Sequence, residues 1–241
     1  MTKNIFIPIK EHSERVPRKN FREFCGKPLY LHTLYKYDGL DVKIFINTDS
    51  EEIENEIKKE QKKGRLFNVN VIRRKNKLIG DDVSVNLLIQ DFLDEKYVEW
   101  NDWIAQIHVT TPFLNAETVI KSLEYMLIKG LIRHEDKFKN KIGEYDSATS
   151  VTIHRARLWR NESYGFCPVN HNPMKLEKTQ DLPVLYEENS CFYIFNRNNF
   201  NKIGGYRVGK MPYFSTIYFP ENLDIDTEED MDMCLKLSKI I

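Results

Sequence analysis

The chain has 241 residues, enough for one α/β domain with a full hydrophobic core, with or without a small subdomain. Lysine plus arginine and aspartate plus glutamate both number 36, so the formal net charge is zero. No bulk charge attracts nucleic acid or a membrane surface, and neither is expected as a partner. Anions must be bound by local clusters of cations.

The apolar residues, 41% of the chain, are spread evenly. No apolar run approaches the roughly 20 residues that a membrane span needs, and no signal-like segment is seen, so we expect a cytoplasmic protein. The four cysteines stand far apart without a CxxC pair. This spacing argues against a zinc knuckle and against a disulfide scaffold.

Short apolar segments alternate with amphipathic ones through the first half of the chain. Strands are predicted at residues 4–9, 42–47, 69–73 and 103–109. Helices are predicted from Pro28 to about 37, from caps at 48–50 to about 61, at 84–94, and from 116 to about 130. This βαβ order predicts a parallel, doubly wound sheet that binds ligands at the carboxyl ends of its strands.

The alternation is lost over residues 134–189, where only 147–153 has the pattern of a strand. We interpret this stretch as an inserted arm or lid of a single domain that spans residues 1–241. Further strands are predicted at 191–195 and 216–219. A closing helix runs to Lys239 from a capping box of Thr227 and Asp230.

A basic loop follows the first strand and contains Lys10, Ser13, Arg15, Arg18 and Lys19. Lysine as a point charge, arginine as a planar fork and serine as a hydroxyl donor are the groups that bind phosphate. The position after a buried strand favours a phosphate site. By composition alone, a solvated charged loop explains the same residues.

Two carboxylates, Asp224 and Asp226, stand two residues apart near the end of the chain. In an extended segment such residues face the same side, so both can bind one hard cation such as Mg²⁺, with Ile225 turned into the core. Alternatively, Asp226 caps the last helix and Asp224 is simply exposed.

Residues 7–20, IPIKEHSERVPRKN, resemble the opening signature of the CMP-sugar synthetases. That signature is IPARxxSKGxPxKN in the sialic-acid branch and IPARxxSxRxPxK in the Kdo branch, and this chain is a hybrid of the two. It departs from the family at Ile9, Lys10 and Glu14. The resemblance implies that the loop grips the phosphates of CTP through Lys10, Ser13, Arg15, Lys19 and Asn20, with Lys10, Arg15 and Lys19 as the catalytic cations.

Further matches cover Gly26–Leu29, Asn47–Ile53 and the end of the third strand. The resemblance implies that Arg73 and Ser84 also bind CTP, with Asp81 in the loop between them. From the residues alone, Arg73 is a surface arginine and Ser84 a helix cap.

Two segments resemble the part of the family that approaches the acid substrate. Residues 108–112, HVTTP, resemble QPTSP of the sialic-acid branch, without the metal-binding aspartate of the Kdo branch, and residues 180–190 resemble RQxLPxxYxxNG. Leu114 and Thr179 stand where the family has arginine, and Ser190 where it has glycine. The implied substrate-binding residues are His108, Thr111, Gln180, Tyr186 and Asn189. As an alternative, His108 is a hydrogen-bonded residue near a strand end.

Residues 224–230, DIDTEED, resemble the family element DIDTxxD, which implies an Mg²⁺ site at Asp224 and Asp226. The family implies a Rossmann-like three-layer αβα fold with a mostly parallel sheet and a small dimerisation arm. Relatives are commonly homodimers, and a homodimer is expected here, with residues from about 145 to 189 as the arm.

The sequence as a whole predicts a cytidylyltransferase that transfers CMP from CTP to a sialic-acid-like sugar acid and releases pyrophosphate. One alternative keeps this reaction but uses Kdo or another anionic acceptor. A second is a nucleotide-binding homologue that has lost catalysis. A third, ranked last, is a glycosyltransferase that uses Asp224-Ile225-Asp226 as its DxD motif.

Overall fold

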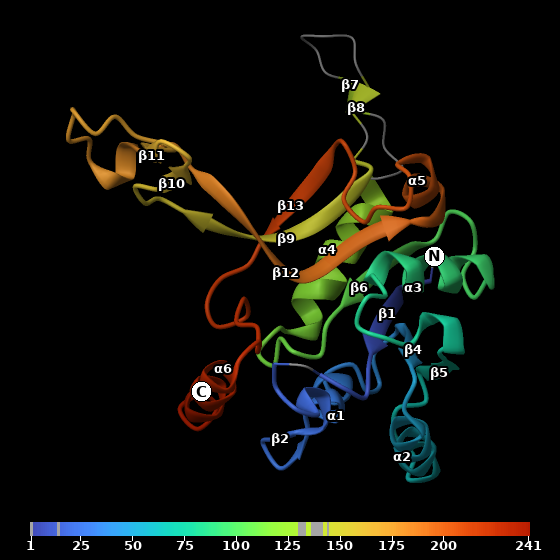
Figure 1. Ribbon diagram of the computed structural model, residues 1–241. Coiled ribbons are helices and arrows are strands. Elements are labelled where there is room, and N and C mark those ends of the chain that lie inside the picture. Colours follow the sequence, from blue (N-terminus) through green and yellow to red (C-terminus); the bar gives the residue numbers. More distant parts are fainter. Residues whose placement is uncertain (1, 14, 130–133, 136–141, 144) are drawn as a thin grey trace.

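The computed structural model describes residues 2–13, 15–129, 134–135, 142–143 and 145–241. A seven-stranded sheet runs through the centre in the order β13-β9-β12-β6-β1-β4-β5 (Figure 1). Its strands are β1 (Asn4–Ile9), β4 (Lys43–Thr48), β5 (Val69–Arg73), β6 (Trp103–Ile107), β9 (Ser147–His154), β12 (Leu185–Asn196) and β13 (Pro212–Thr216).

Most neighbouring strands are parallel, as the βαβ order predicts. β1 pairs in parallel with β4 and β6, and β4 pairs in parallel with β5. β13 is parallel to β9, whereas β12 is antiparallel to both β6 and β9. The Rossmann-like, mostly parallel sheet is therefore confirmed, and β12 is its antiparallel strand.

Helices cover both faces of the sheet, because the side chains of β1 alternate between two hydrophobic clusters. Ile5, Ile7 and Ile9 pack with α1 (Leu29–Tyr35), α2 (Glu51–Lys62) and α4 (Ala116–Lys129) on one face. Phe6 packs on the other face with α3 (Val85–Asp94) and α5 (Arg197–Lys202). The result is the expected three-layer αβα arrangement.

The last helix, α6 (Glu228–Leu237), packs against the segment before α1 through a small cluster that includes Phe24, Leu29 and Ile225. Its amino end has the predicted capping box, in which Asp230 N donates to Thr227 Oγ1 at 3.2 Å and Thr227 N donates to Asp230 Oδ2 at 2.8 Å. This packing brings the end of the chain beside its beginning.

Residues 155–184 project from the sheet as an arm (Figure 1). Its hairpin consists of β10 (Trp159–Glu162) and β11 (Gly165–Pro168), followed by the 3₁₀ turn η3 (Thr179–Asp181). The rest of the predicted 134–189 insertion includes β9, which belongs to the central sheet, and a short pair, β7 (His134–Glu135) and β8 (Ile142–Gly143).

The predicted strand at 216–219 is wrong. β13 ends at Thr216, and Tyr218 and Phe219 are 65% and 67% exposed. Ile217 N still donates to the Val151 carbonyl oxygen of β9, and the chain then turns toward α6. Residues after Ile217 therefore leave the edge of the sheet. Apolar residues that continue past a strand end look like strand in the sequence.

Other elements are short or lie outside the predicted pattern. β12 begins six residues earlier than predicted, at Leu185 instead of Cys191, and α5 was not expected. The remaining elements are η1 (Lys19–Phe21), β2 (Glu23–Phe24), β3 (Lys27–Pro28) and η2 (Asn76–Leu78). None of the helices in the described residues has the length and apolar character needed to cross a bilayer.

Candidate active site

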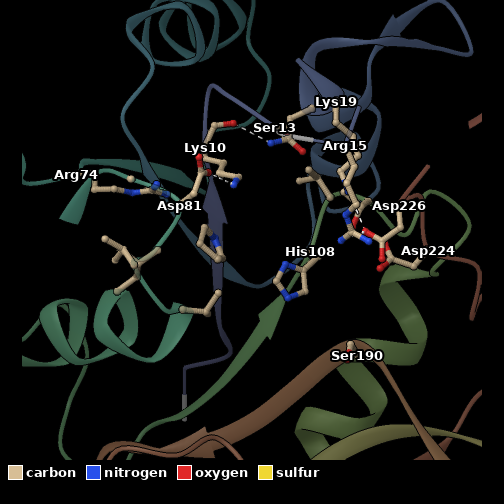
Figure 2. A pocket seen from close by; sticks show the side chains of 18 residues that line it. Lys10, Ser13, Arg15, Lys19, Arg74, Asp81, His108, Ser190, Asp224 and Asp226 are labelled. Atoms are coloured by element: carbon tan, nitrogen blue, oxygen red, sulfur yellow. Dashed lines mark hydrogen bonds and ion pairs between the residues drawn. The ribbon is translucent and has the colours of Figure 1, made fainter. Parts of the chain in front are cut away.

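A cavity of about 380 Å³ opens where β1, β5 and β6 end (Figure 2). These three strands run parallel to one another or to the intervening β4, so their carboxyl ends lie at one edge of the sheet. Eight predicted site residues line the cavity: Lys10, Ser13, Arg15, Lys19, Asn20, His108, Asp224 and Asp226. The basic loop and the carboxylate pair therefore share one site.

The basic loop is closed onto the carboxylates. Lys19 Nζ donates to the Ile225 carbonyl oxygen at 2.6 Å and lies 3.2 Å from Asp226 Oδ1. The guanidinium of Arg15 reaches the same Asp226 oxygen at 2.9 Å. Figure 2 shows both cations turned toward the Asp224–Asp226 corner of the cavity. Opposite charge thus holds the two ends of the chain together in this protein.

The start of the loop is held by Asn20, which is buried and donates from Nδ2 to the Lys10 carbonyl oxygen at 2.9 Å. The Lys10 ammonium forms an ion pair of 2.6 Å with Asp81, in the loop before α3. These contacts place a lysine charge at the cavity wall opposite Asp226 (Figure 2). Cations therefore line both sides of the cavity, as a polyphosphate would require.

The two carboxylates are not equivalent. Burial raises the pKa of Asp224; the charge of Asp226 adds to this effect, and hydrogen bonding by Thr110 opposes it. Asp224 Oδ1 is buried and accepts no hydrogen bond in the described part of the chain. A buried carboxylate oxygen without a donor is suited to a cation ligand, because the cation would replace the missing hydrogen bond.

His108 forms part of the cavity wall between the basic loop and β12. Its pKa is lowered to about 4, first by burial and then by the positive charges of Arg207 and Lys19. Gln106 holds the ring: its Oε1 accepts from Arg207 at 2.6 Å, so its Nε2 donates to His108 Nε2 at 3.0 Å. The neutral imidazole consequently carries its proton on Nδ1 and can donate a hydrogen bond from that atom.

Residues 5–240 match the family model described as cytidylyltransferase. The chain belongs to the cytidylyltransferase family. It is a CTP-dependent nucleotidyltransferase, and the resemblance to the CMP-sugar synthetases seen in the sequence is confirmed.

Curated relatives and solved structures agree with this assignment. The cytidylyltransferase is 26% identical over 240 residues to the pseudaminic acid cytidylyltransferases of Campylobacter jejuni subsp. jejuni serotypes O:2 and O:23/36, covering 97% of this chain and 95% of each relative.

The solved structure of CMP:2-keto-3-deoxy-manno-octonic acid synthetase complexed with CTP is 14% identical and covers 99% of both chains, with a TM-score of 0.64. A 4-diphosphocytidyl-2C-methyl-D-erythritol synthase from Anaerococcus prevotii is 12% identical, covers 98% of this chain and 96% of its own, and has a TM-score of 0.61. At these identities the two structures show the shared fold.

Of the two neighbouring arginines at the end of β5 in this cytidylyltransferase, Arg74 lines the cavity and the predicted Arg73 does not. Arg74 is 5% exposed and donates from Nε to Asn47 Oδ1 at 2.8 Å and from Nη2 to the Ile9 carbonyl oxygen at 3.2 Å. Arg73 turns outward and pairs with Glu51 at 3.5 Å. Successive side chains of a strand point to opposite faces of the sheet, so Arg73 and Arg74 point in opposite directions. Knowing which face of β5 the cavity lies on would have identified Arg74.

The other predicted residues lie outside the cavity wall. Ser84 stands at the N-cap position of α3 but makes no side-chain capping hydrogen bond. Thr111 is buried and donates to the His108 carbonyl oxygen at 3.1 Å. Asn189 donates to Thr152 Oγ1 at 3.0 Å. Of these three residues, Thr111 thus supports the backbone of a cavity residue.

Gln180 lies in η3 on the arm, and Tyr186 is 51% exposed at the beginning of β12, where its ring meets that of Phe214. Of the positions where the family has arginine, Leu114 is 3% exposed in the core and Thr179 is on the arm. The substitution at Glu14 falls outside the described residues.

Proposed function

We propose that this cytidylyltransferase transfers CMP from CTP to a nonulosonic sugar acid of the sialic or pseudaminic type, with release of pyrophosphate. The observation that carries the proposal is the single cavity in which the cations of the first loop face the Asp224–Asp226 pair. The names of the curated relatives support an acidic nine-carbon sugar as the acceptor class.

In the proposed reaction an acceptor hydroxyl attacks the α-phosphorus of CTP in line. A new phosphorus–oxygen ester bond forms, the bond to the pyrophosphate oxygen breaks, and the hydroxyl proton is lost. Phosphoryl-type transfers depend mainly on positioning and neutralisation of charge, so no protein nucleophile is needed. Lys10, Arg15 and Lys19 neutralise the phosphates, and Arg74 with its backbone contacts shapes the nucleotide side of the cavity.

In this scheme His108 acts as a hydrogen-bond donor and does not act as a general base. Its Nε2 is occupied by Gln106, and its pKa of about 4 keeps the ring neutral at pH 7. Nδ1–H is therefore available to position the acceptor on the β12 side of the cavity.

We further propose that Mg²⁺ is the cofactor, held by Asp224 and Asp226. Among the described residues no cluster of three or more histidine, cysteine or carboxylate side chains is present, so the protein supplies two carboxylates and the nucleotide and water supply the rest. This division is usual for magnesium. When bound, the ion would neutralise charge on the phosphates and support pyrophosphate as the leaving group. Arg15 and Lys19 would then turn from Asp226 to the phosphates.

The test is incubation of the purified protein with CTP, Mg²⁺ and one acid at a time, pseudaminic acid, N-acetylneuraminate or Kdo, while pyrophosphate is measured. We expect release with pseudaminic acid or N-acetylneuraminate. Turnover with Kdo alone would replace this proposal with the Kdo alternative. CTP binding without turnover on any acid would support a homologue that has lost catalysis.

We also propose a homodimer in which the arm contacts the other subunit. The arm exposes six large apolar side chains, each at least 50% accessible: Trp159, Tyr164, Phe166, Val169, Met174 and Leu176. Contiguous exposed apolar residues favour an interface. Gln180, on the arm, and Tyr186, at the beginning of β12, would meet an acid substrate. Light scattering on the protein and on a Phe166→Ser, Leu176→Ser variant tests it, and a monomeric parent protein would overturn it. The cytoplasmic location stays a prediction from the sequence.

A further inference from the structure

An acid acceptor needs a cation that the phosphates of CTP do not already occupy. Lys10, Arg15, Lys19 and Arg74 line the cavity, and the proposed function assigns all four to CTP. The two positions where the family would supply an arginine hold Leu114, in the core, and Thr179, on the arm. The cation for the acceptor's carboxylate must therefore come from another part of the chain. This reasoning rests on the proposed function.

Arg207 lies in the segment between α5 and β13, behind the part of the cavity wall that His108 and Ser190 form. Its guanidinium carbon lies 3.9 Å from the centre of the Tyr193 ring, and Nη1 donates to Gln106 Oε1 at 2.6 Å. Gln106 and Tyr193 each contact a residue of the cavity wall. Gln106 contacts His108, and the Tyr193 hydroxyl lies 2.9 Å from Ser190 Oγ. His108 and Ser190 line the cavity.

The charge of Arg207 is only partly compensated. In the described part of the chain it forms no ion pair with a carboxylate. Burial lowers its pKa, and Tyr193 and then Glu188 oppose that effect. A half-buried guanidinium that is fixed by an amide and an aromatic face still has several N–H groups in a fixed fork. Such a fork matches a carboxylate, which would satisfy the charge.

We propose that Arg207 binds the carboxylate of the acceptor acid at the edge of the cavity, with Gln106 fixing the guanidinium and His108 donating to the same substrate. The nucleotide and the acid are then held by separate sets of cations. Tyr193 fixes the plane of the guanidinium, so the site recognises a planar anion and not merely negative charge.

The experiment measures KM for the acid and for CTP in Arg207→Met and Arg207→Lys, using pseudaminic acid and its methyl ester as acceptors. The matched control is Arg197→Met, because Arg197 also lies over an aromatic ring, Trp100, at 4.7 Å, but belongs to α5 and pairs with Asp94 instead of with Gln106. We expect Arg207→Met to raise KM for the acid about 10- to 100-fold and to leave KM for CTP within about twofold. Arg207→Lys should recover only part of the loss.

The methyl ester, which has no free carboxylate, shows whether Arg207 recognises the carboxylate of the acceptor or only supports the surrounding residues. The parent protein should prefer the acid to the ester, and Arg207→Met should lose that preference. Equal losses on acid and ester, or a rise in KM for CTP of the same size, would show that Arg207 only supports Gln106 and Tyr193 and would overturn the inference. A parent protein inactive on every acid would instead overturn the proposed function.

Discussion

Lys19 and Asp226, which are 207 positions apart in the chain, are joined by an ion pair of 3.2 Å between Nζ and Oδ1. Lys19 is largely buried, and its second contact, to the Ile225 carbonyl oxygen, fixes the backbone between Asp224 and Asp226. The basic loop and the acidic segment therefore position one another before any nucleotide binds. This dependence leads to the first prediction.

Asp226→Ala should lower turnover at least about 100-fold, because one of the two proposed metal ligands is lost. In buffer without Mg²⁺ the same variant should bind CTP at least as tightly as the parent, because Arg15 and Lys19 are released from Asp226. Pyrophosphate release and calorimetric titration with CTP measure the two effects.

The control for this variant is Asp232→Asn on the exposed side of α6, where Asp232 pairs with Lys236. It should have the parent's turnover, since an exposed helix pair contributes at most a few tenths of a kcal/mol. Full turnover in Asp226→Ala would contradict the metal assignment.

Substitution of Arg73, at the end of β5, and of Arg74, directly after it, should have very different effects on CTP binding and on the free energy of unfolding. Arg74→Met should weaken CTP binding at least about 10-fold and lower the free energy of unfolding by roughly 2 kcal/mol, because Asn47 Oδ1 and the Ile9 carbonyl lose a buried donor. Arg73→Met should change neither by a measurable amount, since its pair with Glu51 is exposed. CTP titration and urea unfolding on both variants decide the point; equal effects would refute the assignment of Arg74 to the site.

His108 should make the stability of the protein depend on pH below neutrality. Its pKa is about 4 when folded and 6.5 when unfolded, so the unfolded chain binds the proton more readily between these values. Stability should be complete above pH 6.5 and fall by up to about 3 kcal/mol as the pH approaches 4.

The measurement is urea unfolding of the parent and of His108→Gln between pH 7.5 and 4.5. The raised pKa of Asp224 acts in the opposite direction, but both proteins share it, so the difference between them isolates His108. His108→Gln should lose less stability on acidification. If the two profiles ran parallel, the depressed pKa of His108 would be disproved.

Ser190 lies in the left-handed backbone region at φ 59°, where the register of β12 with β9 shifts. This conformation explains why the family has glycine at the matching position, since a side chain there costs about 1 kcal/mol. Ser190→Gly and Ser190→Ala both lose the Tyr193 hydrogen bond, but only glycine relieves the left-handed backbone, so the free energy of unfolding should be about 1 kcal/mol higher for Ser190→Gly than for Ser190→Ala. Urea unfolding compares them. Glycine no more stabilising than alanine would argue against strain at Ser190.

The alternation of apolar segments was enough to predict the parallel part of the sheet. β1, β4, β5 and β6 are short, mostly apolar segments, each followed by a helix that covers a face of the sheet, so the local pattern and the tertiary contacts agree. β12 and β13 were harder because their ends are set by pairing with β9. Tyr218 and Phe219 have the composition of a strand but lie beyond the last residue of β13 that pairs with β9, Thr216.

For the site, motif spacing identified the residues that lie on loops directly after strands, such as Lys10, Lys19 and His108. It did not separate Arg73 from Arg74, because that choice depends on which face of β5 reaches the sheet edge. It also did not find Arg207, which belongs to no motif and reaches His108 only through Gln106. The spacing of residues along the sequence does not show a contact that is made through an intermediate residue, as Arg207 contacts His108 through Gln106.

The position of the acidic segment also has a consequence for synthesis on the ribosome. β13 is the last strand of the seven-stranded sheet to be made and ends at Thr216, before Asp224 and Asp226 are translated. Every strand of the sheet is thus present in a nascent chain whose basic loop still lacks its acidic counterpart. Assembly of the site is therefore a late event, completed only when the last residues emerge and α6 docks beside Phe24 and Leu29.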